Sequence, residues 1–225
     1  MSLDGKIIVV TGAAGALGSS VCALLEDLGG TVVRLDMVRP VADRVEQVFE
    51  LNLTDEQSVR SRFQAIAARN ERIDGLVNLA GAFRWQTLTE GDISAWDHLY
   101  EANLRTAALC CMAVLPFLPR PGGRIVNIGA NAAVKATDGM GAYAASKAGV
   151  AKLTEALSEE LKSAGITVNA VLPGIIDTPA NRSGMPDADH GLWVPPHHIA
   201  DLIAFLLSTR AASITGALVP VTGRA

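Results

Sequence analysis

The chain has 225 residues, of which 49% are hydrophobic, 19% are charged and 4% are aromatic, and its net charge is −4. This length and composition suit one globular domain over residues 1–225 with a large aliphatic core. The absence of a basic block argues against nucleic acid as a partner. The uncharged run at residues 7–25 is interrupted by glycines and serines, which argues against a membrane span.

The amino terminus lacks the features of a targeting signal, so we expect a cytoplasmic protein. Cys22, Cys110 and Cys111 have neither metal-ligand nor disulfide spacing, and we interpret them as reduced core thiols. No carboxylate or cysteine completes a ligand spacing with the adjacent pair His197 and His198, so we expect no metal site.

The chain opens with a pattern that alternates between strand and helix. We predict a strand at residues 6–11, a glycine-rich turn at 12–18, a helix to residue 28 and a second strand at 31–35 that leads into Asp36. This order is typical of a dinucleotide site, because glycines let the backbone approach a pyrophosphate and the helix amino terminus offers it unpaired N–H groups.

Asp36 closes the second strand, where an acid accepts hydrogen bonds from the adenosine ribose hydroxyls and repels a 2′-phosphate. Arg34 and Arg39 are the cations near it in the sequence. We therefore favour NAD(H) over NADP(H) as the cofactor.

Strands and helices continue to alternate along the rest of the chain. We predict strands at residues 47–51, 73–79, 124–128, 166–172 and 218–221, and helical regions at 56–69, 92–118 and from before Tyr143 to about residue 164. This alternation predicts an α/β fold: a single-domain, doubly wound parallel sheet (Rossmann fold) of about seven strands with helices on both faces. Residues 173–196 break the alternation, and we predict a mobile cover over the crevice at the carboxyl ends of the strands.

Tyr143 and Lys147 lie four residues apart in a helix-prone segment, so both side chains share one helix face. A fixed positive charge beside a phenol lowers the pKa of the phenol. Such a pair can transfer a proton while a cofactor moves a hydride. A packed tyrosine beside a solvated lysine has the same spacing, and the pair alone does not decide between these readings. Ser146 points off the face of the pair, and we assign it no role.

Further motifs lie along nearly the whole chain: Thr11-Gly12 with Gly15 and Gly18, Asp36, Asn78 to Gly81, Asn103, Tyr143 with Lys147, Asn169, and Pro173-Gly174 followed by Thr178. Together they resemble the short-chain dehydrogenase/reductase family. The resemblance implies an NAD(P)-dependent oxidoreductase that acts on a small molecule. It implies that Tyr143 is the general acid/base, that Lys147 holds the nicotinamide ribose and lowers the phenol pKa, and that Asn103 supports a proton path. The cofactor contacts that it implies are Gly12, Gly15, Leu17, Gly18, Asp36, Asn52, Leu53, Asn78, Ala80, Gly81, Tyr143, Lys147, Pro173, Gly174, Ile176 and Thr178.

The chain departs from the family pattern at two places. Gly15 comes one residue early, and Ala16 replaces the second glycine of the common turn. Ala130 stands where the family has a catalytic serine, and residues 128–133 contain no hydroxyl. Losing such a donor usually lowers the rate by orders of magnitude. Asn131 offers a donor one residue away.

The dihydropteridine reductase branch of the family lacks this serine, and residues 129–140 and 177–193 resemble that branch. A quinonoid dihydropterin needs only a hydride and one proton, so no serine has to stabilise an alkoxide. We therefore predict NADH-dependent reduction of a quinonoid dihydropterin or a similar conjugated imine or quinone. The candidate substrate contacts are Ala130, Asn131, Phe83, Trp85, Met185 and Trp193. Phe83 and Trp85 either stack on a flat ring or pack against the cover.

Two other functions stay open. A carbonyl reductase or alcohol dehydrogenase would use Asn131 or a water in place of the serine, and a non-catalytic NAD-binding sensor or scaffold would need no catalytic pair. The intact Tyr143, Lys147 and Asn103 argue against the sensor. The apolar stretch at residues 107–114 predicts burial against another helix or a subunit, and with the helix after Tyr143 it predicts a homodimer or homotetramer.

Overall fold

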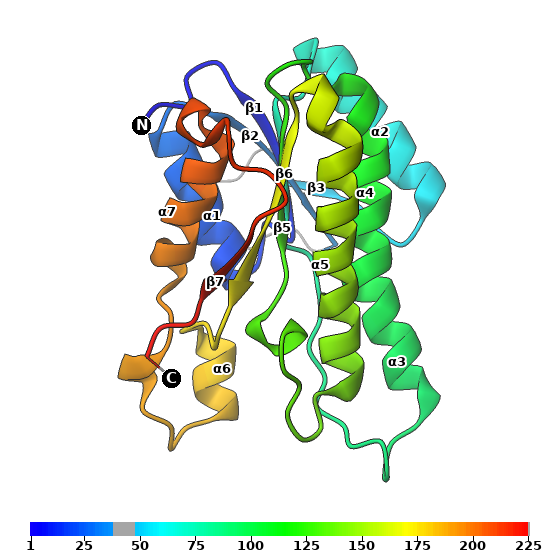
Figure 1. The fold of residues 1–225 in the computed structure, drawn as a ribbon, viewed down its shortest axis with the longest axis vertical. Coiled ribbons are helices and arrows are strands. Elements are labelled where there is room, and N and C mark those ends of the chain that lie inside the picture. Colours follow the sequence, from blue (N-terminus) through cyan, green and yellow to red (C-terminus); the bar gives the residue numbers. More distant parts are fainter. Residues whose placement is uncertain (38–47, 225) are drawn as a thin grey trace.

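A parallel sheet forms the centre of the molecule, and helices pack on both of its faces (Figure 1). The computed structural model describes residues 1–37 and 48–224. The strands of the described residues lie in the order β3-β2-β1-β4-β5-β6-β7, and all of their pairings are parallel. The strands are β1 (Ile7–Thr11), β2 (Thr31–Asp36), β3 (Val48–Glu50), β4 (Gly75–Asn78), β5 (Arg124–Ile128), β6 (Thr167–Pro173) and β7 (Leu218–Val221). The predicted doubly wound α/β fold is confirmed.

The helices divide the apolar core into two layers. They are α1 (Ala16–Asp27), α2 (Glu56–Asn70), α3 (Ile93–Leu99), α4 (Thr106–Val114), α5 (Gly141–Leu161), α6 (Pro179–Gly184) and α7 (Pro196–Leu207). Neighbouring residues of β1 supply both layers: Val9 packs with residues of α2, α4 and α5, and Val10 packs with residues of α1 and α7. Strands covered on both faces are typical of parallel sheets, which explains their nearly continuous apolar sequence.

The helical region predicted at residues 92–118 is confirmed, but it is not one regular α-helix. α3 begins after Asp92, whose side chain accepts a hydrogen bond from Ser94 N at 2.9 Å. A π-helical turn at Tyr100–Arg105 separates α3 from α4. The apolar stretch at residues 107–114 packs mainly in the core that it shares with α2. Of the two predicted partners, another helix or a subunit, the structure therefore shows a helix of the same chain.

Other boundaries differ from the predictions by a few residues. β4 begins at Gly75 rather than at residue 73, and β3 ends at Glu50 rather than at residue 51. Gln47, the predicted first residue of that strand, lies outside the described residues. α2 has its N-cap at Asp55, whose side chain accepts a hydrogen bond from Gln57 N at 3.1 Å.

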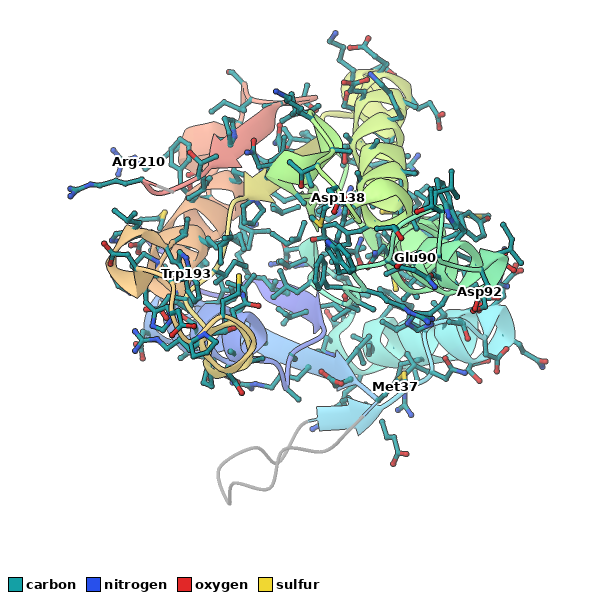
Figure 2. All side chains as sticks on the ribbon, turned by 90° about the horizontal axis from the view of Figure 1, so that it is seen from below. Met37, Glu90, Asp92, Asp138, Trp193 and Arg210 are labelled. Carbon is teal, nitrogen blue, oxygen red and sulfur yellow. The ribbon has the colours of Figure 1, made fainter. Side chains whose placement is uncertain are left out.

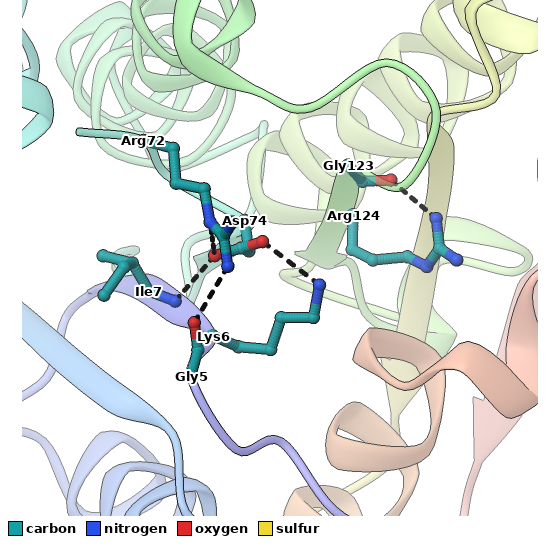
Figure 3. Close-up of polar contacts among 7 residues, drawn as sticks. All are labelled: Gly5, Lys6, Ile7, Arg72, Asp74, Gly123 and Arg124. Atoms are coloured by element: carbon teal, nitrogen blue, oxygen red, sulfur yellow. Dashed lines mark hydrogen bonds and ion pairs between the residues drawn. The ribbon is translucent and has the colours of Figure 1, made fainter. Parts of the chain in front are cut away.

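Paired charges occupy the amino ends of β1 and β4 (Figure 3). The buried carboxylate of Asp74 accepts hydrogen bonds from Lys6 Nζ at 3.1 Å, Ile7 N at 2.9 Å and Arg72 Nε at 3.0 Å. These bonds tie the chain just before β4 to the start of β1. The carboxylate is thereby compensated by two cations and a backbone donor.

The segment at residues 173–196 lies at the opposite, carboxyl end of the sheet, which Figure 2 views directly. It contains α6 and a 3-10 turn at His190–Leu192, and a bridge between Ile176 and Val194 joins its two ends. Asp177 forms an ion pair with Arg182 inside the segment. The predicted cover is therefore built around a helix of its own rather than being a simple loop.

Candidate functional site

Two glycines of the turn between β1 and α1, Gly12 and Gly18, have no room for a side chain. Gly12 has a φ of +66°, and a Cβ there would lie 2.7 Å from Ala80 N. A Cβ on Gly18 would lie 2.2 Å from Gly12 O. Gly15 is the N-cap of α1 and supplies no side-chain hydrogen bond, while Leu17 is half-buried in the first turn. A helix amino terminus without a side-chain cap, beside backbone free of Cβ atoms, fits the pyrophosphate of a dinucleotide.

Asp36 faces this turn from the end of β2. Its Oδ2 accepts a hydrogen bond from Ala14 N at 2.8 Å, which fixes the carboxylate beside the glycine turn. Arg34 forms a bidentate pair with Glu26 of α1, with distances of 2.6 and 2.7 Å. The guanidinium is thereby held by a carboxylate. Arg39, the other cation that the sequence places nearby, lies outside the described residues.

Asn52 and Leu53, two of the predicted cofactor contacts, lie in a turn after β3. Asn52 Oδ1 accepts hydrogen bonds from Thr54 N at 3.0 Å and from Thr54 Oγ1 at 2.9 Å. Leu53 is buried in the core. The side-chain oxygen of Asn52 is thus engaged in hydrogen bonds that stabilise the turn.

Buried polar side chains connect the ends of β4 and β5 to α5. Asn78 Nδ2 donates to Asn127 Oδ1 at 2.9 Å, and Asn127 Nδ2 donates to Thr154 Oγ1 at 2.9 Å. Beyond β4, Ala80 N donates to Thr11 Oγ1 at 3.3 Å. These bonds hold Asn78 and Ala80, two of the predicted cofactor contacts, against neighbouring strands.

Asn103 lies in the π-helical turn at Tyr100–Arg105, an irregularity that is frequent at functional sites. Its Oδ1 accepts from Ala82 N at 2.8 Å, and its Nδ2 donates to Ala82 O at 3.1 Å. Nδ2 also donates to Ser146 Oγ at 2.9 Å, and Ser146 Oγ donates to Tyr143 O at 2.7 Å. Ser146, to which the sequence analysis gave no role, therefore connects Asn103 to the backbone of Tyr143. The spacing of three residues between Tyr143 and Ser146 could have indicated this contact, because residues three apart on a helix are neighbours.

Tyr143 and Lys147 lie one turn apart on α5. Tyr143 is half-buried, and burial raises the pKa of its phenol to about 12. Lys147 is 5% exposed, and burial lowers the pKa of its ammonium to about 8. Its Nζ donates to Ile128 O at 2.9 Å. In this structure burial of the phenol, rather than the neighbouring lysine, sets the direction of the phenol pKa shift.

Gly81 brings the candidate residues together. A Cβ at this position would lie 2.6 Å from Asn103 Oδ1 and 3.3 Å from Lys147 Nζ. Both side chains therefore flank the backbone of Gly81. Three residues that are far apart in the sequence meet beside the end of β4.

Ala130, at the position where the resemblance implies a serine, is buried, with 6% of its surface exposed. It precedes a 3-10 turn at Asn131–Ala133, and the side chain of Asn131 is exposed. The structure thus places a buried methyl group at the position for which the resemblance implies a hydroxyl.

The remaining cofactor candidates follow β6, which ends at Pro173. Gly174 N donates to Val221 O at 2.9 Å, and a Cβ on Gly174 would lie 3.0 Å from Thr222 O. Thr178 caps α6 by accepting from Asn181 N at 3.2 Å. A side chain on Gly174 would crowd the segment that follows β7.

Two predicted substrate contacts lie in the cover. Met185 follows α6 and is 38% exposed. Trp193 is only 5% exposed, and its ring packs on that of His190 with centroids 4.4 Å apart. Trp193 is therefore part of the interior of the cover rather than an exposed contact, since the indole has enough apolar area to serve as the local core.

Phe83 and Trp85, the other two aromatic candidates, have their described ring contact and hydrogen bond near the start of α5. The ring of Phe83 meets the ring of Tyr143 edge-on, with centroids 5.0 Å apart. Trp85 Nε1 donates to Asp138 O at 2.9 Å. The segment after β4 therefore reaches the start of α5.

The thiols and histidines supply no second site. Burial raises the pKa of Cys22 to about 11 and that of Cys111 to about 12, so both thiols keep their protons at neutral pH. Within residues 1–37 and 48–224, no three histidine, cysteine or carboxylate side chains are arranged to hold a metal ion. None of the helices described is long and apolar enough to cross a membrane.

Comparisons with known proteins agree with this geometry. A family model described as short chain dehydrogenase matches residues 6–189. The chain is 30% identical to the 3-oxoacyl-(acyl-carrier-protein) reductase FabG of Thermotoga maritima, with 99% of this chain and 98% of the relative covered. It is 33% identical to the enzyme of the same name from Escherichia coli K12, with the same coverage. The ligand-free aldohexose dehydrogenase of Thermoplasma acidophilum has a similar structure, with a TM-score of 0.91 at 26% identity over 99% of this chain and 94% of that chain.

The chain therefore belongs to the short-chain dehydrogenase/reductase family. It is an NAD(P)-dependent oxidoreductase.

Proposed function

We propose that the protein is an NADH-dependent reductase of a flat, conjugated acceptor, such as a quinonoid dihydropterin or a similar imine or quinone. The observation that carries the proposal is the buried methyl group of Ala130 at the position where the family has a hydroxyl. A ketone accepts hydride as charge builds on one oxygen, which needs donors beside it. A conjugated ring spreads that charge and needs one proton.

Tyr143 is the proposed proton donor. With a pKa of about 12, its phenol is fully protonated at neutral pH and can act as an acid in the reductive direction. Lys147, held at Ile128 O, is the residue that would hold the nicotinamide ribose, with Asn103 and Gly81 beside it. A bound nicotinamide supplies the hydride.

The exposed ring of Phe83 supports a flat substrate. It is 60% exposed and lies against the ring of Tyr143. An aromatic face beside the proton donor favours stacking by a planar acceptor. Asn131 and Met185 are the other proposed contacts.

A carbonyl reductase is the second candidate. The relatives described above carry the name 3-oxoacyl-(acyl-carrier-protein) reductase at 30% and 33% identity, rather than that of a dihydropteridine reductase. In that case Asn131 or a water would replace the missing hydroxyl. The exposed side chain of Asn131 is the feature that favours it.

NADH rather than NADPH is the proposed cofactor. Asp36 is fixed beside the glycine turn, and Arg34 is held by Glu26. A carboxylate at this place accepts from ribose hydroxyls and repels a 2′-phosphate. We further propose a homodimer or homotetramer, for which the exposed apolar side chains of Tyr100 and Met112 would supply surface.

The test is NADH oxidation with quinonoid dihydrobiopterin, a set of quinones and a 3-oxoacyl thioester, each with wild type, Tyr143→Phe and Asn131→Ala. We expect turnover of the flat acceptors, a fall of about 10²- to 10⁴-fold in kcat for Tyr143→Phe, and a higher KM with little change in kcat for Asn131→Ala. Thioester turnover that is lost in Asn131→Ala would favour the second candidate. Tight NADH binding without turnover of any acceptor would reject both.

A further inference from the structure

The segment that follows Gly81 runs from the end of β4 to the start of α5 and is fixed at both of its ends. At the first end, Ala82 exchanges two hydrogen bonds with the side chain of Asn103. At the second end, Trp85 Nε1 donates to Asp138 O and Gln86 N donates to Gly139 O, each at 2.9 Å. Phe83 lies between these two attachments.

The second attachment depends on a glycine. Gly139 has a φ of +68°, and a Cβ there would lie 2.1 Å from the indole of Trp85. The indole therefore lies flush on the backbone of the turn that leads into α5. Figure 2 labels Asp138, which accepts the indole N–H, at the end of the molecule where the strands finish.

The start of α5 is also held by side chains, since Ser146 Oγ donates to Tyr143 O and accepts from Asn103 Nδ2. Met140 is its N-cap and supplies no side-chain hydrogen bond. Gly141, the first residue of the helix, lies near the ring of Trp96, since a Cβ there would be 3.6 Å from that ring. Tyr143 comes two residues later, so the position of its phenol depends on how this helix start is held.

We infer that Trp85 is a positioning residue for the reaction, because it fixes the segment that keeps the ring of Phe83 on Tyr143 and also fixes the start of the helix that carries Tyr143. Trp85 is 55% exposed, so its role rests on the N–H bond and the contact with Gly139 rather than on core packing. Removing it frees Phe83 and admits water to the phenol. This inference rests on the proposed role of Tyr143 as proton donor.

The test reads the phenol directly and needs no substrate. The chain has two tyrosines, so in a Tyr100→Phe background the tyrosinate absorbance reports Tyr143 alone. We expect Tyr143 in that background to stay protonated to about pH 11, because its pKa is raised to about 12. Adding Trp85→Ala should lower the midpoint by about one pH unit, towards the usual value of about 10. Trp85→Phe keeps the ring but loses the donor and should give a smaller shift.

Gly139→Ala provides an independent variant with Trp85 intact, because its Cβ would displace the indole; it should shift the midpoint in the same direction. Leu88→Ala is the matched control, since Leu88 lies in the same stretch of chain and is 79% exposed. With an active acceptor, Trp85→Ala should lower kcat about tenfold while the Kd for NADH is unchanged. An unshifted phenol midpoint in both Trp85→Ala and Gly139→Ala would overturn the inference, whatever the substrate proves to be.

Discussion

The two ends of the sheet treat buried charge in opposite ways. At the amino end, the carboxylate of Asp74 is compensated by Lys6 and Arg72 (Figure 3). At the carboxyl end, the ammonium of Lys147 is equally buried, but its described hydrogen-bond partner is the carbonyl of Ile128. A buried charge without an opposite charge destabilises a fold, so it is retained where function needs it.

Arg124 shows that the division is not absolute. It is buried at the amino end of β5, where its Nη1 donates to Gly123 O at 2.9 Å, and burial lowers its pKa. Its Nε has no partner in the described structure. Unlike Lys147, however, Arg124 has none of the candidate catalytic groups beside it. We therefore compare Asp74, whose compensated charge is expected to stabilise the fold, with Lys147, whose buried charge is expected to serve the reaction.

Asp74→Asn should produce the largest effect on stability. The substitution removes the charge that Lys6 and Arg72 share and places an amide N–H₂ against one of these donors. We expect the free energy of unfolding to fall by about 2–3 kcal/mol, measured by urea unfolding. Asp97→Asn, at an exposed position, is the control and should change it by less than about 0.5 kcal/mol. Equal stability of both variants would show that the ion pairs at this end contribute nothing.

Lys147→Met should change how the free energy of unfolding depends on pH, because it removes a buried charge that has no described opposite charge. The pKa of Lys147 is lowered to about 8 in the fold from an ordinary 10.5, so between these values the unfolded chain binds more protons than the folded one. The unfolding free energy of the wild type should therefore rise with pH in this window. The variant lacks that rise, so the wild type should gain about 1–2 kcal/mol relative to it between about pH 8 and pH 10.

The control for that measurement is Lys152→Met. Lys152 lies on the same helix, is exposed and pairs with Glu155. Its difference from the wild type should stay flat over the same pH range. A flat difference for Lys147→Met as well would mean that the ammonium is not held in a desolvated site.

The sequence predicted the fold well because a parallel sheet leaves a strong pattern. Strands such as residues 124–128 are apolar on both faces and were predicted with their correct ends. The helical region at 92–118 was also predicted, but its division by a π-helical turn was not, because no residue type marks such a turn. Apolar periodicity therefore identified the layers but not the irregular turn on which Asn103 lies.

The candidate site was predictable only where a residue type is demanded by geometry. Gly12 and Gly18 were predictable because other backbone atoms come too close there for a side chain. Tyr143 and Lys147 were predictable because a spacing of four residues puts them on one helix face. The raised phenol pKa and the contact of Trp85 with Asp138 depend on tertiary packing, which adjacent sequence does not encode. The burial of Trp193 was missed for the same reason.

Asp36→Asn is the smallest of the expected effects and tests whether charge at the carboxyl end also selects the cofactor. Asparagine keeps an oxygen that can accept from Ala14 N but loses the repulsion of a 2′-phosphate. We expect the ratio of the Kd values for NADPH and NADH to fall about fivefold, measured by fluorescence titration, which corresponds to about 1 kcal/mol. Glu26→Gln keeps Asp36 and weakens the hold on Arg34, so it should shift the ratio in the same direction by less. If Asp36→Asn leaves the ratio unchanged while Glu26→Gln lowers it, the arginine rather than the carboxylate controls selection, and the carboxylate serves only to hold the glycine turn.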